Sequence, residues 1–190
     1  MAITFTDFEG NEKKENEAKA GMMEVLAKIG KANKYLNDLK IAFQDGSLNS
    51  KPKDFEKPYI TWFGALDGNR INQVAANIHK TLRQLTESNI TIYFMGPACE
   101  KGDYAYTNDT NHGSLNGVTV HLCDQYFRAP LLGNNSQTGT LIHEFTHIIF
   151  NTDDHDYGQK ECKALAKNNP ALAIDNADNY EYFIESQSDQ

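Results

Sequence analysis

The pentapeptide HEFTH, residues 143–147, carries the residue types of a zinc hydrolase at a spacing that places them on one helical turn. His143 and His147 stand four residues apart, so their imidazoles project from one face of a helix. Zinc binds imidazole nitrogen well, and catalytic zinc sites usually have three protein ligands and one position for water. Glu144 follows the first ligand, where a carboxylate can take a proton from that water. We therefore expect His143 and His147 to bind one Zn²⁺ and Glu144 to be the general base.

The segment directly after this helix offers side chains that can complete the metal site. It reads NTDDHDYG, residues 151–158, and holds four possible third ligands: Asp153, Asp154, His155 and Asp156. Gly158 permits a sharp chain reversal that can return one of them to the ion. An acidic surface turn would have a similar composition, but the position directly after HEFTH favours a ligand. Spacing alone does not choose among the four.

The helix that carries HEFTH is expected over about residues 138–150, after a Gly/Asn/Ser loop that follows Pro130. Its apolar residues would bury the helix and exclude water from the site around the metal. Two further helices are expected over about 159–167 and 170–185, the second of them broken near Asn176.

The first half of the chain predicts two more helices. Between Ala18 and Phe43 the apolar residues recur at alternating spacings of four and three, which draws one stripe along a long helix. A coiled-coil seam has the same pattern, but so short a run beginning with alanine more often packs on its own domain. A polar loop over 45–58 leads to a second helix over 71–85, with Asp67 available as its cap.

Three short segments change to the composition of strands. Residues 90–95, 104–107 and 118–122 are β-branched or aromatic and are separated by Gly and Asn-Asp turns. The order helices, strands, helices predicts an α+β fold with a small sheet. A length of 190 residues with 39% hydrophobic residues suits a single domain over 1–190. We expect residues 1–11 and 186–190 to be flexible, and we favour a monomer.

The charge of the chain bears on its partners. A formal net charge of −8 disfavours nucleic acid or an anionic membrane as partner, because both present negative surfaces. A cationic substrate suits this charge better. No stretch approaches the roughly 18 consecutive apolar residues that membrane insertion requires. We therefore expect neither nucleic-acid binding nor insertion into a membrane.

Around these motifs the chain resembles the aspzincin metallopeptidases, and within them the peptidyl-Lys metalloendopeptidases. Those enzymes carry His-Glu-x-x-His followed by Gly-Thr-x-Asp-x-x-Tyr-Gly, and the second block corresponds to residues 151–158 here. Further similar blocks occur in the same order: YITWFG from Tyr59, VTVHLC ending at Cys123, RAP from Arg128, SQTGTLIHE from Ser136 and NADNYEYFIE from Asn176. The resemblance is clearest over about 59–185, and several spaced blocks are more specific than one motif.

The resemblance implies a zincin-like metalloprotease domain with the HEFTH helix over the small sheet. It selects Asp154 as the third ligand, and it gives Tyr157 the hydrogen bond to the developing oxyanion. It also places Asp178 and Glu181 in the pocket for the residue after the cut. Two carboxylates three residues apart share one helix face and can hold a lysine ammonium by charge-assisted hydrogen bonds.

The chain departs from the family pattern near the third ligand. Asn151 stands where the family has glycine, and the loop from His147 to Asp154 is shorter than in the lysine-specific members. Asp156 is therefore kept as a reserve ligand. His79, His112 and His121 are expected to be structural or solvent-exposed.

The three cysteines leave the compartment open, because they cannot all pair within one chain. The resemblance implies a disulfide between Cys99 and Cys123, and it offers no counterpart for Cys162. It also suggests a secreted or exported protein. The N-terminal residues lack the basic-then-apolar order of a signal peptide.

The function expected from these observations is zinc-dependent hydrolysis of peptide bonds in a protein or peptide substrate, on the amino side of lysine. Two alternatives stay open. The same peptidase can act as an exported toxin or effector, and a zinc-binding module can engage partners without catalysis. The presence of Glu144 and Tyr157 argues against the second alternative.

Overall fold

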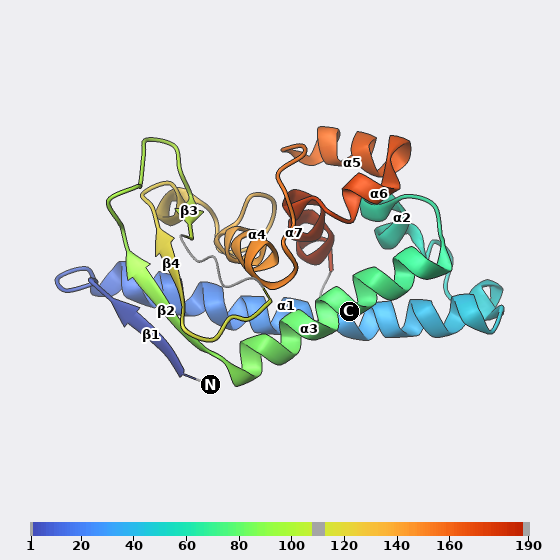
Figure 1. The fold of residues 1–190 in the computed structure, drawn as a ribbon, viewed down its shortest axis with the longest axis horizontal. Coiled ribbons are helices and arrows are strands. Elements are labelled where there is room, and N and C mark those ends of the chain that lie inside the picture. Colours follow the sequence, from blue (N-terminus) through green and yellow to red (C-terminus); the bar gives the residue numbers. More distant parts are fainter. Residues whose placement is uncertain (1, 108–112, 188–190) are drawn as a thin grey trace.

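The structure is a computed structural model that describes residues 2–107 and 113–187. Its helices are α1 (Glu12–Gln44), α2 (Lys57–Phe63), α3 (Gly68–Glu87), α4 (Gln137–Phe150), α5 (Gln159–Asn168), α6 (Pro170–Ala173) and α7 (Ala177–Glu185). Its strands are β1 (Ala2–Thr6), β2 (Asn89–Phe94), β3 (Ala105–Tyr106) and β4 (Val118–Leu122), with short 3-10 turns at Ser47–Ser50 and Tyr126–Arg128. The expected α+β class is confirmed (Figure 1).

The long helix α1 forms the base of the molecule (Figure 1). The apolar stripe predicted from Ala18 onward is buried over most of its length, and it packs against α3, α4 and α7. The stripe residues therefore pack in the core of their own domain and do not form a coiled-coil seam. The second predicted helix is α3, and the side chain of Asp67 caps it by accepting a hydrogen bond from the Arg70 amide at 3.0 Å.

The four strands form one sheet in the order β1-β2-β4-β3. Strand β2 pairs in parallel with both β1 and β4, whereas β3 pairs antiparallel with β4. Alternate residues of the two central strands are fully buried: Ile90, Ile92, Val118 and Val120. Strand β3 lies at the edge of the sheet next to α4, so this edge faces the helix that carries HEFTH (Figure 1).

Helix α4 lies between β3 and α7, and both of its ends are fixed by local contacts. Ser136 caps its start, because the Ser136 hydroxyl accepts a hydrogen bond from the Gly139 amide at 2.9 Å. Asn151 ends it in the left-handed conformation, with φ of 57°. Asparagine tolerates this conformation better than most residues do. Asn151 can therefore fill the position where the family has glycine.

Two N-terminal segments differ from the sequence-based expectation. Residues 1–11 were expected to be flexible, but Ala2–Thr6 forms β1 and pairs with β2 along its whole length. The loop expected over 45–58 ends early, because Lys57–Phe63 forms α2. Pro58 lies in the first turn of α2, where the missing amide hydrogen breaks no helical bond.

The C-terminal segment was also expected to be flexible over 186–190. Residues 188–190 lie outside the described part of the chain, as do Met1 and His112. Gln187 is buried, and its carbonyl accepts a hydrogen bond from Nζ of Lys28 at 2.6 Å. Among the described helices, none is both long and apolar enough to cross a membrane.

Candidate active site

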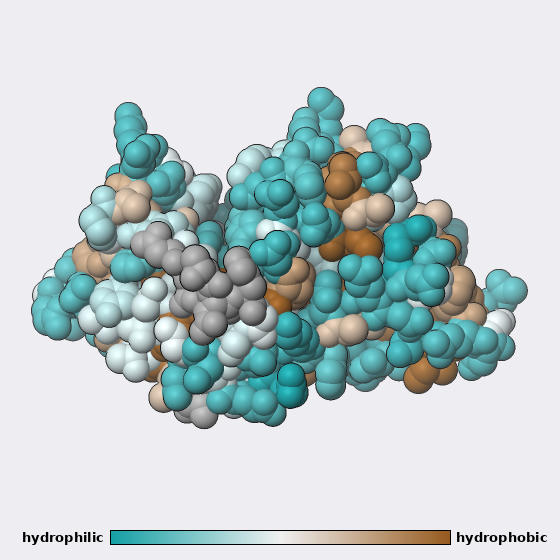
Figure 2. All heavy atoms as spheres, viewed as in Figure 1, coloured by the Kyte–Doolittle hydropathy of each residue, from teal (hydrophilic) through white to brown (hydrophobic). Residues whose placement is uncertain are grey.

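A cleft of about 1000 Å³ opens beside α4. It is lined by β3 and the turn before it, by α4, by the segment after α4 and by α7. Figure 2 shows the corresponding notch in the surface between the sheet and the C-terminal helices. The cleft brings together all seven candidate residues: His143, Glu144, His147, Asp154, Tyr157, Asp178 and Glu181.

Three acceptor atoms converge in this cleft. The Nε2 atoms of His143 and His147 lie 3.0 Å apart, and each lies 3.4 Å from Oδ1 of Asp154. In both rings Nδ1 faces an oxygen that can only accept, so Nδ1 carries the hydrogen and Nε2 of the neutral ring carries a lone pair. Three electron pairs thus point at one another, an arrangement that a cation stabilises.

The donor set and its spacing fit one zinc ion. Ligand atoms about 2.0–2.1 Å from a tetrahedral zinc lie roughly 3.3–3.4 Å from each other, close to the separations of the three acceptor atoms here. Two imidazole nitrogens and one carboxylate oxygen match the three protein ligands that a catalytic zinc usually takes, with one further position for water. His143, His147 and Asp154 are therefore the residues that would hold the zinc.

Each histidine is oriented by a second contact. Nδ1 of His143 donates to Oδ1 of Asp178 at 2.9 Å, and Nδ1 of His147 donates to the carbonyl of Thr152 at 2.8 Å. Such contacts fix the tautomer and the ring orientation of a metal ligand. For His143, burial opposes the charged ring, but the hydrogen bond that it donates to Asp178 raises its pKa well above the ordinary value. Asp178 therefore makes His143 more basic.

The buried side chain of Asn176 helps to hold the turn that carries Asp154. Its Oδ1 accepts hydrogen bonds from the amides of His155 and Asp156 at 2.8 and 3.1 Å, and its Nδ2 donates to the carbonyl of Asp156 at 3.0 Å. Asp153 adds backbone hydrogen bonds on both sides of Asn176. The turn is thereby fixed against the start of α7.

The other three candidate ligands point elsewhere. Asp153 accepts from the amide of Asp154, and Nε2 of His155 lies 2.9 Å from Oδ2 of Asp175, within hydrogen-bond distance. Asp156 engages Asn176 through its backbone. Within the described part of the chain, Asp154 alone of the four lies in a possible metal-binding group with both histidines of HEFTH.

Glu144 is buried at the inner wall of the cleft, with 8% of its surface exposed. Burial raises the pKa of its carboxyl group, and the charges of His143 and His147 act against that rise. A carboxylate whose pKa is raised toward neutrality is a stronger base. Its environment therefore suits proton transfer.

Tyr157 lies at the rim of the cleft and is 61% exposed. Its pKa is raised to about 12, first by burial and then by its hydrogen bond with Asp154. The phenol consequently keeps its proton at neutral pH. It is available as a hydrogen-bond donor beside the third ligand.

Asp178 and Glu181 both lie buried on α7, but their surroundings differ. Asp178 is engaged through both oxygens, because Oδ2 accepts from the Gly158 amide at 2.9 Å while Oδ1 accepts from His143. Glu181 has an oxygen 3.6 Å from Nδ1 of His143, and burial raises the pKa of its carboxyl group. Glu181 is thus the less satisfied carboxylate of the two.

Sequence reasoning missed the supporting roles of Thr152, Asn176 and Gly139. A Cβ atom at Gly139 would lie 2.7 Å from Oε1 of Glu181, so the glycine allows α7 to bring its carboxylates against α4. The similarity of the blocks around Ser136 and Asn176 was the available signal. It marked these segments as important without showing what they contact.

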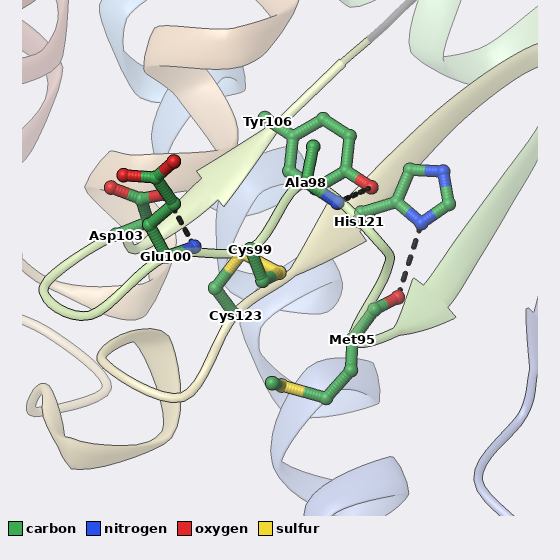
Figure 3. The surroundings of a disulfide bond; sticks show 8 residues. All are labelled: Met95, Ala98, Cys99, Glu100, Asp103, Tyr106, His121 and Cys123. Carbon is green, nitrogen blue, oxygen red and sulfur yellow. Dashed lines mark hydrogen bonds between the residues drawn. A yellow bond between two sulfur atoms is a disulfide. The ribbon is translucent and has the colours of Figure 1, made fainter.

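The disulfide implied by the resemblance is present between Cys99 and Cys123. It joins the turn before β3 to the residue after β4, and the amide of Ala98 donates to the Tyr106 hydroxyl at 3.4 Å beside it (Figure 3). The wall formed by Gly102–Thr107 is therefore anchored covalently. Cys162 is a buried free thiol whose pKa burial raises to about 12.

Comparison with known proteins agrees with this geometry. A family model of aspzincins, described as lysine-specific metallo-endopeptidase, matches residues 48–185. A peptidyl-Lys metalloendopeptidase of Pleurotus ostreatus is 40% identical over 131 residues, which are 67% of this chain and 73% of that protein. An extracellular protease of Aeromonas hydrophila is 33% identical over 148 residues, which are 77% of this chain and 40% of that longer protein.

A solved structure has the same fold. The zinc peptidase from Grifola frondosa superposes with a TM-score of 0.69 at 27% identity, covering 91% of this chain and 94% of that one. The family match spans the HEFTH helix, the segment that follows it and α7. The chain therefore belongs to the aspzincin family of zinc metalloendopeptidases.

Proposed function

We propose that this chain cleaves proteins on the amino side of lysine, with Glu181 as the principal partner of the lysine ammonium. The observation that carries the proposal is the charge of the cleft. Glu144, Asp154, Asp178 and Glu181 all line it, and its described lining residues include no lysine or arginine. A cationic side chain next to the proposed zinc ligands would therefore have carboxylates near it and, among the described lining residues, no lysine or arginine.

Glu181 is suited to bind an ammonium group because it is desolvated and lacks a strong partner. Its raised pKa shows that the buried carboxylate is costly when charged, and a lysine ammonium would reverse that cost through a charge-assisted hydrogen bond. Asp178 adds negative charge nearby while it orients His143. The two carboxylates expected to share the pocket thus have different roles: Glu181 binds the lysine ammonium, and Asp178 orients His143.

The chemistry follows from the remaining residues. His143, His147 and Asp154 would hold the zinc, which when bound would supply a Lewis acid for a carbonyl group and lower the pKa of a water molecule. Glu144 takes the proton of the attacking water and delivers it to the leaving amine. Tyr157 donates a hydrogen bond to the oxygen that gains charge, and losing such a donor typically costs about 10²-fold in rate.

We also propose that the enzyme acts outside the cell on protein substrates. The disulfide between Cys99 and Cys123 supports an oxidising compartment, where such bonds persist. A relative named as an extracellular protease supports the same location. The oligomeric state expected from the sequence, a monomer, stays a prediction.

Matched peptides test the lysine pocket. One peptide carries lysine after the scissile bond, and the other carries norleucine, which keeps the alkyl stem without the ammonium. We expect kcat/KM to favour lysine at least tenfold in the parent enzyme, and Glu181→Gln to remove most of that preference. Equal cleavage of both peptides by the parent enzyme would refute the proposed specificity.

A further inference from the structure

A second, smaller hollow of about 430 Å³ adjoins the active-site cleft. Asn134, Gln159 and Tyr182 line both cavities, so the hollow continues the cleft rather than forming a separate site. Its other walls come from α2, from the residues just before it and from α5. Neither the zinc ligands nor Glu144 line it.

The hollow has an aromatic wall with cations beside it. Trp62 stacks on Tyr182, with ring centroids 5.2 Å apart, and Nζ of Lys163 lies 4.8 Å from the centre of the Trp62 ring. Lys57 also lines the hollow, opposed by one carboxylate, Asp54. With two lysines and one aspartate among its lining residues, this hollow has a net positive charge. The cleft, in contrast, is lined by carboxylates.

The position of Tyr182 shows how a substrate would reach the hollow. Tyr182 directly follows Glu181 on α7, and it is a lining residue of both cavities. A lysine held at Glu181 is the first residue after the scissile bond. Because Tyr182 borders both cavities, the residues that follow such a lysine would have a path out of the cleft past Tyr182 into the hollow.

We propose that this second hollow is a subsite for an acidic side chain one or two residues after the substrate lysine. The inference rests on the proposed lysine specificity, because a substrate lysine bound at Glu181 fixes where the following substrate residues begin. Lys163 and Lys57 supply the ammonium groups that meet the acid, and Trp62 packs against its methylene groups. The enzyme then selects a basic residue followed closely by an acidic one.

The expected preference is modest. Lys57, Lys163 and Asp54 are all solvent-exposed, and exposed ion pairs are screened by water and salt. An acidic residue should therefore lower KM by about two- to fivefold relative to alanine, with little change in kcat. A lysine at the same position should raise KM.

Peptide kinetics test the subsite. All peptides carry lysine after the scissile bond, and the next two positions carry alanine, aspartate or lysine in turn. In the parent enzyme, aspartate at one of these positions should give the lowest KM. The double variant Lys57→Ala/Lys163→Ala should lose the difference, and Asp54→Ala should enlarge it. Lys160→Ala provides the control, because Lys160 is an exposed lysine of α5 that lines neither cavity.

A binding measurement separates this inference from catalysis. Trp62 is the single tryptophan of the chain and lies in the wall of the hollow. In the Glu144→Gln variant, the Lys-Ala-Asp peptide should change Trp62 fluorescence at a two- to fivefold lower concentration than the Lys-Ala-Ala peptide.

Equal KM values for aspartate, alanine and lysine in the parent enzyme would overturn the subsite. So would an unchanged acid preference in the double variant. The lysine and norleucine pair, run alongside, shows whether the specificity at Glu181 has failed instead, since that comparison does not involve the second hollow.

Discussion

Nδ1 of His143 donates to Oδ1 of Asp178 at 2.9 Å, and this contact ties a residue of α7 to a proposed zinc ligand of α4. The ring is thereby turned so that Nε2 faces His147 and Asp154. Asp178 thus contacts His143 directly, whereas Glu181, one turn further along α7, lines the cleft where we propose that the substrate lysine binds.

The first prediction separates these two carboxylates. Asp178→Asn should lower zinc affinity by about 10- to 100-fold, because the neutral amide holds the His143 ring less firmly. Glu181→Gln should leave zinc affinity within about threefold of the parent, while the preference for lysine over norleucine falls. Zinc affinity is measured by competition with a chelator. The reverse pattern would show that the roles are exchanged.

The second prediction concerns the turn that carries Asp154. Asn176→Ala removes the partners of the His155 and Asp156 amides, and buried donors left without acceptors cost about 1–3 kcal/mol each. The variant should lose both unfolding free energy and zinc affinity. Asn169→Ala is the control, because Asn169 caps α6 away from the turn. It should lose stability alone, and an equal loss of zinc affinity there would contradict this account.

The third prediction concerns the disulfide. Replacing Cys99 and Cys123 by alanine frees a closed loop of about 25 residues, which should lower the unfolding free energy by about 3 kcal/mol. The loop carries β3, a wall of the cleft, so KM should rise more than kcat falls. A reducing agent should reproduce the effect in the parent enzyme and have no effect on the double variant. Sensitivity of the double variant to the reducing agent would point to another cause.

The fourth prediction is a pH dependence of stability. Glu185 accepts hydrogen bonds from the amide and hydroxyl of Ser136, and burial, followed by the charge of Glu181, raises its pKa to about 7. Because this pKa exceeds that of the unfolded chain, the folded state binds more protons between about pH 4.5 and 7. The contribution of Glu185 to stability is therefore lost as pH rises through that window.

Urea unfolding at pH 5 and pH 8 tests this sign. Glu185→Gln keeps an oxygen to accept from Ser136 and does not titrate. Relative to the parent, the variant should gain about 1–2 kcal/mol of unfolding free energy between the two pH values, a figure reduced for the partial exposure of the group. A constant difference between variant and parent at both pH values would rule out this titration.

The sequence predicted those parts of the site that depend on local spacing. His143 and His147 share a helix face because they stand four residues apart, and residues 118–122 form a strand with the expected bounds. Strand β1 was missed because a five-residue edge strand gives little periodic signal. Its order comes from pairing with β2, far along the chain.

The choice of Asp154 among four neighbouring candidates needed more than spacing. Asn176 holds the turn from a position about 20 residues downstream, so its contacts cannot be read from local sequence. The resemblance to a family supplied the choice, and the structure supplies a physical account of it. The separate roles proposed for Asp178 and Glu181 rest on their contacts, which the local sequence does not give.

Mapping the new N-termini after digestion of a denatured protein mixture tests the central claim most directly. With zinc present, the parent enzyme should produce N-termini that begin predominantly with lysine. A chelator should abolish the cleavage, and Glu144→Gln should be nearly inactive. Cleavage that continues unchanged in the chelator or in Glu144→Gln, or N-termini without an excess of lysine, would contradict the account.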